Sequence, residues 1–201
     1  MRFATVLDVG ANRGQFALFA KTTWPNAQVI SFEPLPKPAA LLREVFGDAI
    51  EVVQTALSDE IGEAKMFVTE HDDSSSLLPI GENQARISGT KVASVEEAVR
   101  LTTLDAFLAN HHSSAPVLLK IDVQGNELKV LRGAVESFAQ IGTIYCECSY
   151  VELYEGQALA EEVAAFLAGY NFEVTGVFNQ SASASLGQVQ ADFLFQRKGA
   201  L

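Results

Sequence analysis

The stretch Val6-Leu7-Asp8-Val9-Gly10-Ala11-Asn12-Arg13-Gly14-Gln15-Phe16 passes from an apolar run through a glycine turn into the start of a helix. The apolar run Ala4–Val9 has the length of a buried strand. After the turn, Phe16, Phe19 and Ala20 recur at the spacing of one helix face. A strand, a tight turn and a helix are therefore predicted for the first part of the chain.

The turn has the features of a ligand-binding loop. Gly10 allows the backbone to approach a ligand closely, and Gly14 allows a tight entry into the helix. Exposed amides at a helix start favour negatively charged groups, including a carboxylate. Asp8 at the strand end can accept a hydrogen bond from an ammonium group of the ligand. A purely structural role stays open, because Asp-x-Gly also occurs in ordinary tight turns.

A second acidic residue follows the next apolar run, Gln28–Phe32, which we interpret as the second strand. Glu33, in the segment Ser31-Phe32-Glu33-Pro34, lies nineteen residues beyond Gly14. A carboxylate at this place can accept hydrogen bonds from both hydroxyls of a ribose. NAD and S-adenosylmethionine both contain such a ribose, so Glu33 alone leaves the two cofactors open.

The glycine spacing distinguishes the two cofactors. The dinucleotide fingerprint G-x-G-x-x-G cradles a pyrophosphate, whereas this turn has the order Gly10, Asn12, Gly14, with Asp8 two residues before the first glycine. That order suits a ligand with an amino-acid end and no pyrophosphate. We therefore predict S-adenosylmethionine as the cofactor and keep an NAD-dependent oxidoreductase as the alternative.

A third polar segment, Lys120-Ile121-Asp122-Val123-Gln124-Gly125-Asn126-Glu127, overlaps the end of the apolar run Val117–Val123. In an open α/β sheet, ligands bind beyond the carboxyl ends of the strands. Asp122 is therefore expected to face the same crevice as Asp8 and Glu33. The alternative is that Asp122 only supports the turn or the entry into the next helix.

The strand predicted at Ile141–Ser149 carries an unusual charge. Glu147 lies between Cys146 and Cys148 in an apolar run, and a charged residue there needs a partner or a solvent-filled cleft. Glu147 either points into the crevice or forms a salt bridge, for instance with Lys120. The two cysteines should share the other face of the strand as buried, reduced thiols.

The rest of the chain continues the alternation of strands and helices. Further strands are expected at Ile50–Leu57, Ala64–Thr69, Phe172–Phe178 and Ala191–Gln196, further helices around Leu41–Phe46, Thr102–Asn110, Gly125–Arg132 and Leu159–Leu167, and a loop at His71–Arg86. Thr102 with Asp105 resembles a capping box. The link Asn179–Val189 has no helical stripe, so the last strand should run antiparallel to its neighbour.

This order predicts an α/β fold of the Rossmann-like class I methyltransferase type, with a mostly parallel central sheet and an antiparallel last strand. A plain dinucleotide-binding fold normally ends with another helix-linked parallel strand. No shift in composition marks a second domain, so residues 1–201 are expected to form a single one.

Composition argues against several classes of partner. The formal charge is −11, and the fourteen Lys and Arg residues are scattered, whereas nucleic-acid binding normally uses a basic stripe. No apolar run reaches the roughly eighteen residues of a membrane helix, and the N-terminus lacks a basic n-region. We therefore expect a cytoplasmic protein without nucleic-acid or membrane partners. No Cys and His set has zinc spacing, and no metal site is predicted.

At the level of whole motifs, the sequence resembles the FkbM family of methyltransferases. The resemblance spans nearly the whole chain and is carried by the segments 7–16, 32–34, 56–59, 73–78, 103–105, 119–134, 152–156 and 190–192. The most specific of these segments is Leu119-Lys120-Ile121-Asp122-Val123-Gln124-Gly125-Asn126-Glu127-Leu128-Lys129-Val130-Leu131-Arg132-Gly133-Ala134.

The resemblance implies a class I fold and methyl transfer from S-adenosylmethionine, usually to a hydroxyl of a glycan or a natural product. By position it assigns Asp8, Gly10, Asn12 and Gly14 to the methionine end of the cofactor, with Ala11, Gln15 and Phe16 in the same loop. It assigns Glu33, followed by Pro34, to the ribose, Ser58 to the adenine surroundings, and Asp122 to the transferring methyl group.

Methylation of an alcohol also releases a proton, so a nearby base would help. Asp122 is the first candidate for this base and Glu147 the second; alternatively, the two together ligate a magnesium ion. Amino-group methyltransferases often carry an Asn- or Asp-Pro-Pro-aromatic motif after the fourth strand, where this chain has Asp122-Val123-Gln124-Gly125. Oxygen acceptors are therefore favoured. A catalytically silent cofactor-binding module remains a further alternative.

Overall fold

A computed structural model describes residues 1–69, 74–88 and 94–199 of the chain. Its main sheet has seven strands in the order β3-β2-β1-β7-β8-β10-β9. The strands are β1 (Thr5–Val9), β2 (Gln28–Phe32), β3 (Glu51–Val53), β7 (Val117–Ile121), β8 (Ile141–Ser149), β9 (Phe172–Ser183) and β10 (Gly187–Arg197). All neighbouring pairs are parallel except those made by β10, which runs antiparallel to β8 and to β9. The α/β class with an antiparallel last strand is thus confirmed.

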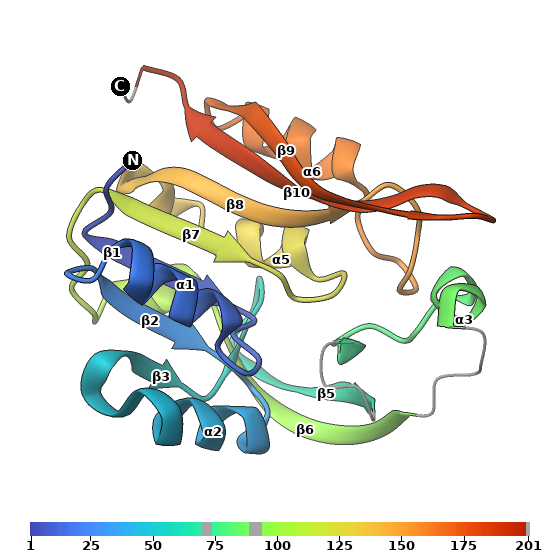
Figure 1. Cartoon of the computed structure of the whole chain (residues 1–201), viewed down its shortest axis with the longest axis horizontal. Helices are drawn as coiled ribbons and strands as arrows, with labels where there is room; N and C mark the ends of the chain where they lie inside the picture. The colour runs from blue at the N-terminus through green and yellow to red at the C-terminus, as the bar shows by residue number, and fades with distance from the viewer. Residues whose placement is uncertain (70–73, 89–93, 200–201) are drawn as a thin grey trace.

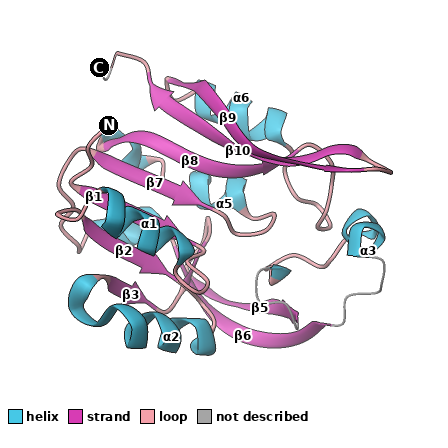
Figure 2. Cartoon of the chain, in the orientation of Figure 1, coloured by secondary structure: helices cyan, strands magenta, loops and turns pink. Residues whose placement is uncertain are grey.

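Helices lie on both faces of this sheet (Figure 1). One face carries α1 (Gln15–Thr23) and α2 (Pro36–Phe46); the other carries α4 (Leu104–Leu108), α5 (Glu127–Arg132) and α6 (Ala160–Ala168). The apolar side chains of β1, β7 and β8 that point toward α5 and α6 form the larger core cluster, and those that point toward α1 form a smaller one. In the part of the first face built by β7, β8 and β10, no described helix covers the strands (Figure 2).

A second, three-stranded sheet of order β4-β6-β5 lies beside the carboxyl end of β2. It consists of β4 (Ala56–Leu57), β5 (Gly62–Thr69) and β6 (Ser94–Thr102), and α3 (Glu82–Ser88) lies between β5 and β6 in the chain. Short 3-10 helices occur at Gly47–Ala49 and Glu136–Ala139. None of the described helices is long and apolar enough to cross a membrane.

Several local expectations were wrong. The strand expected at Ile50–Leu57 is two strands, β3 and β4, which belong to different sheets. Strand β6 was not predicted, because most of its side chains are polar and exposed. The expected loop at His71–Arg86 contains most of α3, and its residues 71–73 lie outside the described part of the chain.

The predicted capping box is also misplaced by one residue. Thr103, not Thr102, is the N-cap of α4, and its hydroxyl accepts a hydrogen bond from the Ala106 amide. Asp105 instead accepts bonds from the amide and hydroxyl of Ser137 at 2.8 and 2.6 Å, tying α4 to the segment before β8. The expectation for Cys146 and Cys148 is confirmed: both are buried on one face of β8 as free thiols.

Candidate active site

A cavity of about 920 Å³ opens at the carboxyl ends of β1, β2 and β7. This volume lies in the range of pockets that hold small molecules and cofactors. Eight of the predicted site residues line it: Gly10, Ala11, Asn12, Gln15, Phe16, Glu33, Pro34 and Asp122. Four others, Asp8, Gly14, Ser58 and Glu147, are not among its lining residues. The structure therefore brings the three polar segments together at one cavity, as expected. Some residues of these segments do not line the cavity.

The glycines of the turn are required by protein neighbours. Gly10 has φ +76°, and a Cβ atom there would lie 1.8 Å from the carbonyl oxygen of Asp122. Gly14 has φ +90°, and a Cβ atom there would lie 2.7 Å from Leu42 and 2.6 Å from Phe46 of α2. The close approach predicted between Gly10 and a ligand is thus an approach to the β7 loop. This contact fixes the turn against the end of β7.

Two buried amide oxygens face the cavity without a partner. Oδ1 of Asn12 and Oδ1 of Asn126 have no hydrogen bond to any described residue, although both residues line the cavity. Asn12 has the left-handed conformation, with φ +45°, and Asn126 is only 2% exposed. Buried polar atoms are normally hydrogen-bonded, so both oxygens are suited to accept hydrogen bonds from a ligand.

Glu33 is held at the cavity wall by the backbone. Its Oε2 accepts a hydrogen bond from the Asn12 amide at 2.9 Å, and its Oε1 accepts one from the Leu35 amide at 2.8 Å. Burial raises the pKa of Glu33 to about 7, although these amide hydrogen bonds oppose the shift. Each carboxylate oxygen has a further lone pair, so Glu33 can still accept hydrogen bonds from two hydroxyls.

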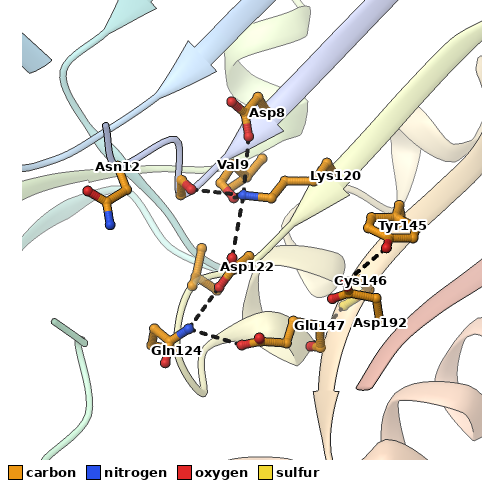
Figure 3. Close-up of polar contacts among 12 residues, drawn as sticks. Asp8, Val9, Asn12, Lys120, Asp122, Gln124, Tyr145, Cys146, Glu147 and Asp192 are labelled. Carbon is orange, nitrogen blue, oxygen red and sulfur yellow. Dashed lines mark hydrogen bonds and ion pairs between the residues drawn. The ribbon is translucent and has the colours of Figure 1, made fainter. Parts of the chain in front are cut away.

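Lys120 is the central cation of the site (Figure 3). Its ammonium lies 3.2 Å from Oδ1 of Asp8 and 3.7 Å from Oδ2 of Asp122, and it donates to the carbonyl of Gly10 at 2.9 Å. Burial alone would lower the pKa of Lys120, but the carboxylates of Asp8 and Asp122 raise it. For Glu147 two alternatives were left open, the crevice or a salt bridge with Lys120. The structure pairs Lys120 with Asp8 and Asp122 instead, and Glu147 is not among the lining residues of the cavity.

Asp8 lies beneath the cavity. Its side chain is fully buried, and Ser31 donates a hydrogen bond to its Oδ2 at 3.4 Å. Burial raises the pKa of Asp8 against the opposing effect of Lys120. Since Lys120 lies between Asp8 and Asp122 (Figure 3), Asp8 holds the lysine that faces the cavity, which differs from the direct ammonium contact expected.

Gln124 joins the two predicted catalytic carboxyl groups. Its Nε2 donates to Oδ1 of Asp122 at 2.8 Å and to Oε2 of Glu147 at 3.0 Å (Figure 3). Its Oε1 accepts a hydrogen bond from the buried Tyr154 hydroxyl at 2.8 Å. Burial, followed by the neighbouring carboxylates with Asp122 first, raises the pKa of Glu147 to about 9. A pKa of about 9 favours the protonated form of Glu147 at neutral pH, and its role as a second candidate base stays a prediction.

Ser58 and Glu127 have structural partners. Ser58 is 2% exposed, and its hydroxyl lies 3.4 Å from Nδ2 of Asn126, which itself lines the cavity. The carboxylate of Glu127 accepts hydrogen bonds from the Val123 and Gly125 amides at 3.2 and 3.0 Å. Burial raises the pKa of Glu127 to about 7. Ser58 thus contacts the lining residue Asn126 from outside the cavity, and Glu127 holds the turn after β7 through the Val123 and Gly125 amides.

Lys120, Gln124 and Asn126 were not predicted as site residues. A lysine inside the apolar strand Val117–Ile121 was the available signal for the first of them. Nothing in the sequence marked Gln124 and Asn126 as site residues, because polar residues beside a glycine such as Gly125 are common in turns.

Comparison with known proteins agrees with this geometry. The model of the methyltransferase FkbM domain matches residues 8–174. The chain is 29% identical over 160 residues to the 2-O-methyltransferase NoeI of Sinorhizobium fredii, covering 76% of this chain and 66%, slightly under two thirds, of that relative. It is 32% identical over 199 residues to the 31-O-demethyl-FK506 methyltransferase FkbM of Streptomyces tacrolimicus, covering 84% and 72%.

A likeness to solved structures supports the fold. The 1,6-didemethyltoxoflavin-N1-methyltransferase of Burkholderia thailandensis, solved with S-adenosylhomocysteine, superimposes with a TM-score of 0.52 at 13% identity. The superposition covers 98% of this chain and 72% of that one. The fold is therefore that of a class I methyltransferase.

Proposed function

The chain belongs to the FkbM methyltransferase family, and from this premise we propose that it transfers a methyl group from S-adenosylmethionine to a hydroxyl oxygen of a small molecule or glycan. The observation that carries the proposal is the position of Asp122, whose carboxylate lines the same cavity as the glycine turn and Glu33. A base beside the cofactor's cavity is what an alcohol acceptor needs. An NAD-dependent oxidoreductase is not favoured, because the chain matches methyltransferases along 8–174.

The lining residues fit the cofactor. Asn12 and Asn126 present buried oxygens that lack partners among the described residues, and these suit ammonium or amine donors. Glu33 is positioned for the ribose hydroxyls, and the start of α1 offers amides for a carboxylate. When bound, S-adenosylmethionine would supply a methyl group on a sulfonium, from which the neutral thioether of S-adenosylhomocysteine is a good leaving group. The protein then has to orient the acceptor and exclude water.

The proposed proton acceptor is Asp122. As the acceptor oxygen bonds to the methyl carbon, its hydroxyl proton passes to the Asp122 carboxylate and then to solvent, since Asp122 is 38% exposed. Lys120 at 3.7 Å and the Gln124 amide at 2.8 Å hold this carboxylate from two sides. Glu147, with a pKa of about 9, retains its proton and serves as a polar support for Gln124.

Replacement of Asp122 by asparagine tests the proposal. Asp122→Asn preserves the shape but removes the charge, so kcat for a hydroxylated acceptor should fall about 10²- to 10⁴-fold. Affinity for S-adenosylhomocysteine, measured by calorimetry, should stay within a few-fold, because the interaction acts mainly in the transition state. Asp48→Asn, at an exposed position of the 3-10 helix Gly47–Ala49, is the matched control. A near-normal kcat in Asp122→Asn, or a parallel collapse of cofactor affinity, would refute the role.

A further inference from the structure

The cavity extends from Asp122 along the helix-free part of the sheet. There it is bounded by an aromatic wall, which we define as Phe16, Phe19, Trp24, Tyr145 and Phe178. The Phe16 and Tyr145 rings are stacked with centroids 6.1 Å apart, and Tyr145 and Phe178 are 6.4 Å apart. At the other end, Phe19 contacts Trp24 edge-on at 5.7 Å. The wall is therefore continuous from α1 to β9.

Much of this aromatic surface is open. Phe19 is 52% exposed and Phe178 is 48% exposed. Within the described residues, no helix lies over β7, β8 and β10 on this side (Figure 2). Exposed apolar surface that lines a cavity marks a binding site more often than it occurs by chance.

The wall contains one built-in polar anchor. Asp192 of β10 lines the cavity, and its Oδ2 accepts hydrogen bonds from the Tyr145 hydroxyl at 2.8 Å and from the Asn179 amide at 2.7 Å. Asp192 lies directly across the strand pair from Glu147, which Gln124 connects to Asp122. The anchor thus lies opposite Glu147 in the strand pair, and Glu147 is linked to the proposed base through Gln124.

The charge of this region is negative. Asp122 and Asp192 both line the cavity, and the lining lysine, Lys120, is already shared between Asp8 and Asp122. A bound anion would therefore meet two carboxylates, and among the described residues Lys120 is the one lysine or arginine side chain that lines the cavity. Like charges repel one another, so the surface discriminates against phosphorylated, sulfated and carboxylated molecules.

We propose that the aromatic wall with Asp192 binds the methyl acceptor, and that this acceptor is a neutral or cationic hydroxylated molecule with an apolar ring face. The ring lies against Phe16, Tyr145 and Phe178, and a hydroxyl or ammonium group donates to Asp192. The opposite end of the acceptor then reaches Asp122. This inference rests on the proposed methyl transfer and specifies the class of its substrate.

Ligand binding at the aromatic wall can be measured by spectroscopy, without an enzymatic reaction, because the wall contains a single tryptophan. Trp24 is the chain's one tryptophan, so protein labelled with 5-fluorotryptophan gives one ¹⁹F resonance from the wall itself. The protein is first saturated with S-adenosylhomocysteine, checked by calorimetry, and then titrated with 2,3-dihydroxynaphthalene or with its 6-sulfonate. The neutral probe should shift the resonance, and the sulfonate should bind at least tenfold more weakly.

Two exposed positions on β9 supply the variant and its control. Phe178→Ala removes part of the wall, whereas Val174→Ala removes a side chain that is 43% exposed and does not line the cavity. Affinity for the neutral probe should fall at least fivefold in Phe178→Ala and stay unchanged in Val174→Ala. Asp192→Asn should reduce the preference for the neutral probe over the sulfonate.

The outcomes separate this inference from the proposed function. If S-adenosylhomocysteine fails to bind, the proposed function is wrong. If S-adenosylhomocysteine binds but the neutral probe leaves the resonance unmoved up to its solubility limit, the wall is not an acceptor site. Equal affinity for the two probes, or equal effects of Phe178→Ala and Val174→Ala, would also overturn the inference.

Discussion

Adding one methyl group at Gly10 should damage both the fold and the proposed chemistry. Gly10 has φ +76° and Gly187 has φ +73°, so an alanine is equally strained at the two positions. The surroundings differ completely. A Cβ atom at Gly10 would lie 1.8 Å from the Asp122 carbonyl oxygen, whereas at Gly187 nothing lies within 4 Å. Gly187→Ala therefore isolates the backbone strain, and Gly10→Ala adds the collision.

The size of the effect follows from this comparison. A left-handed backbone costs a non-glycine residue roughly 1–2 kcal/mol, and this should be the whole loss of unfolding free energy in Gly187→Ala. At Gly10 the two atoms must separate by more than 1 Å to reach a normal contact of roughly 3.5 Å. Such overpacking adds about 1–3 kcal/mol. Gly10→Ala should therefore lose about 2–5 kcal/mol in total.

The displaced group also matters for activity. Asp122 donates its backbone N–H to the Val9 carbonyl at 3.1 Å, so the ends of β1 and β7 are locked together. To relieve the collision at Gly10, the Asp122 backbone must move away from β1, and the Asp122 carboxylate moves with it. A misplacement of about 1 Å can reduce the rate about 10²-fold. The kcat of Gly10→Ala should fall by this order, and that of Gly187→Ala should not.

Urea unfolding followed by circular dichroism at pH 7 measures both stability losses, and turnover of a hydroxylated acceptor measures kcat. Gly10→Ala should be less stable than Gly187→Ala by at least 1 kcal/mol. The reasoning would fail if the two variants lost equal stability. It would also fail if Gly10→Ala folded normally and kept its full kcat, because Gly10 would then have room for a side chain.

Three further results are expected. Lys120→Met leaves the buried carboxyl of Asp8 without its cation and should lower the unfolding free energy by about 3–5 kcal/mol; recovery in the Asp8→Asn/Lys120→Met double variant checks that the loss comes from this pair. Because the folded pKa of Glu33 is raised from 4.5 to about 7, its contribution to stability is present below pH 4.5 and is lost as the pH rises through 7. Affinity for S-adenosylhomocysteine should rise over the same interval as Glu33 ionises. In Glu33→Gln, titration calorimetry should show no such rise, and the loss of stability with pH should be smaller but still present, because Glu127 also has a pKa raised to about 7. Turnover should survive EDTA, since no cluster of three or more metal-ligating side chains occurs in the described residues; loss of activity restored by magnesium would contradict this.

The chain's local patterns were sufficient to predict much of the fold. The glycine turn after β1, the acid after β2 and the polar end of β7 each lie within a few consecutive residues, and the carboxyl ends of parallel strands meet at one edge. That rule was enough to bring Glu33 and Asp122 to one cavity. The terminal hairpin could be predicted in the same way, because a parallel crossover normally contains a helix and this link has no helical stripe.

What the sequence alone left undecided was which polar groups face one another. Lys120 bonds the carbonyl of Val9, 111 residues away, and its choice of Asp8 and Asp122 over Glu147 depends on strand order and register. Gln124 joins Asp122 to Glu147 only because the turn after β7 folds over β8. Strand β6 escaped prediction for the same reason: its pairing with β5 is long-range, and its own side chains are mostly exposed. Periodicity reports how one segment is buried, whereas ion pairs and pKa values depend on distances between segments, which only the tertiary structure fixes.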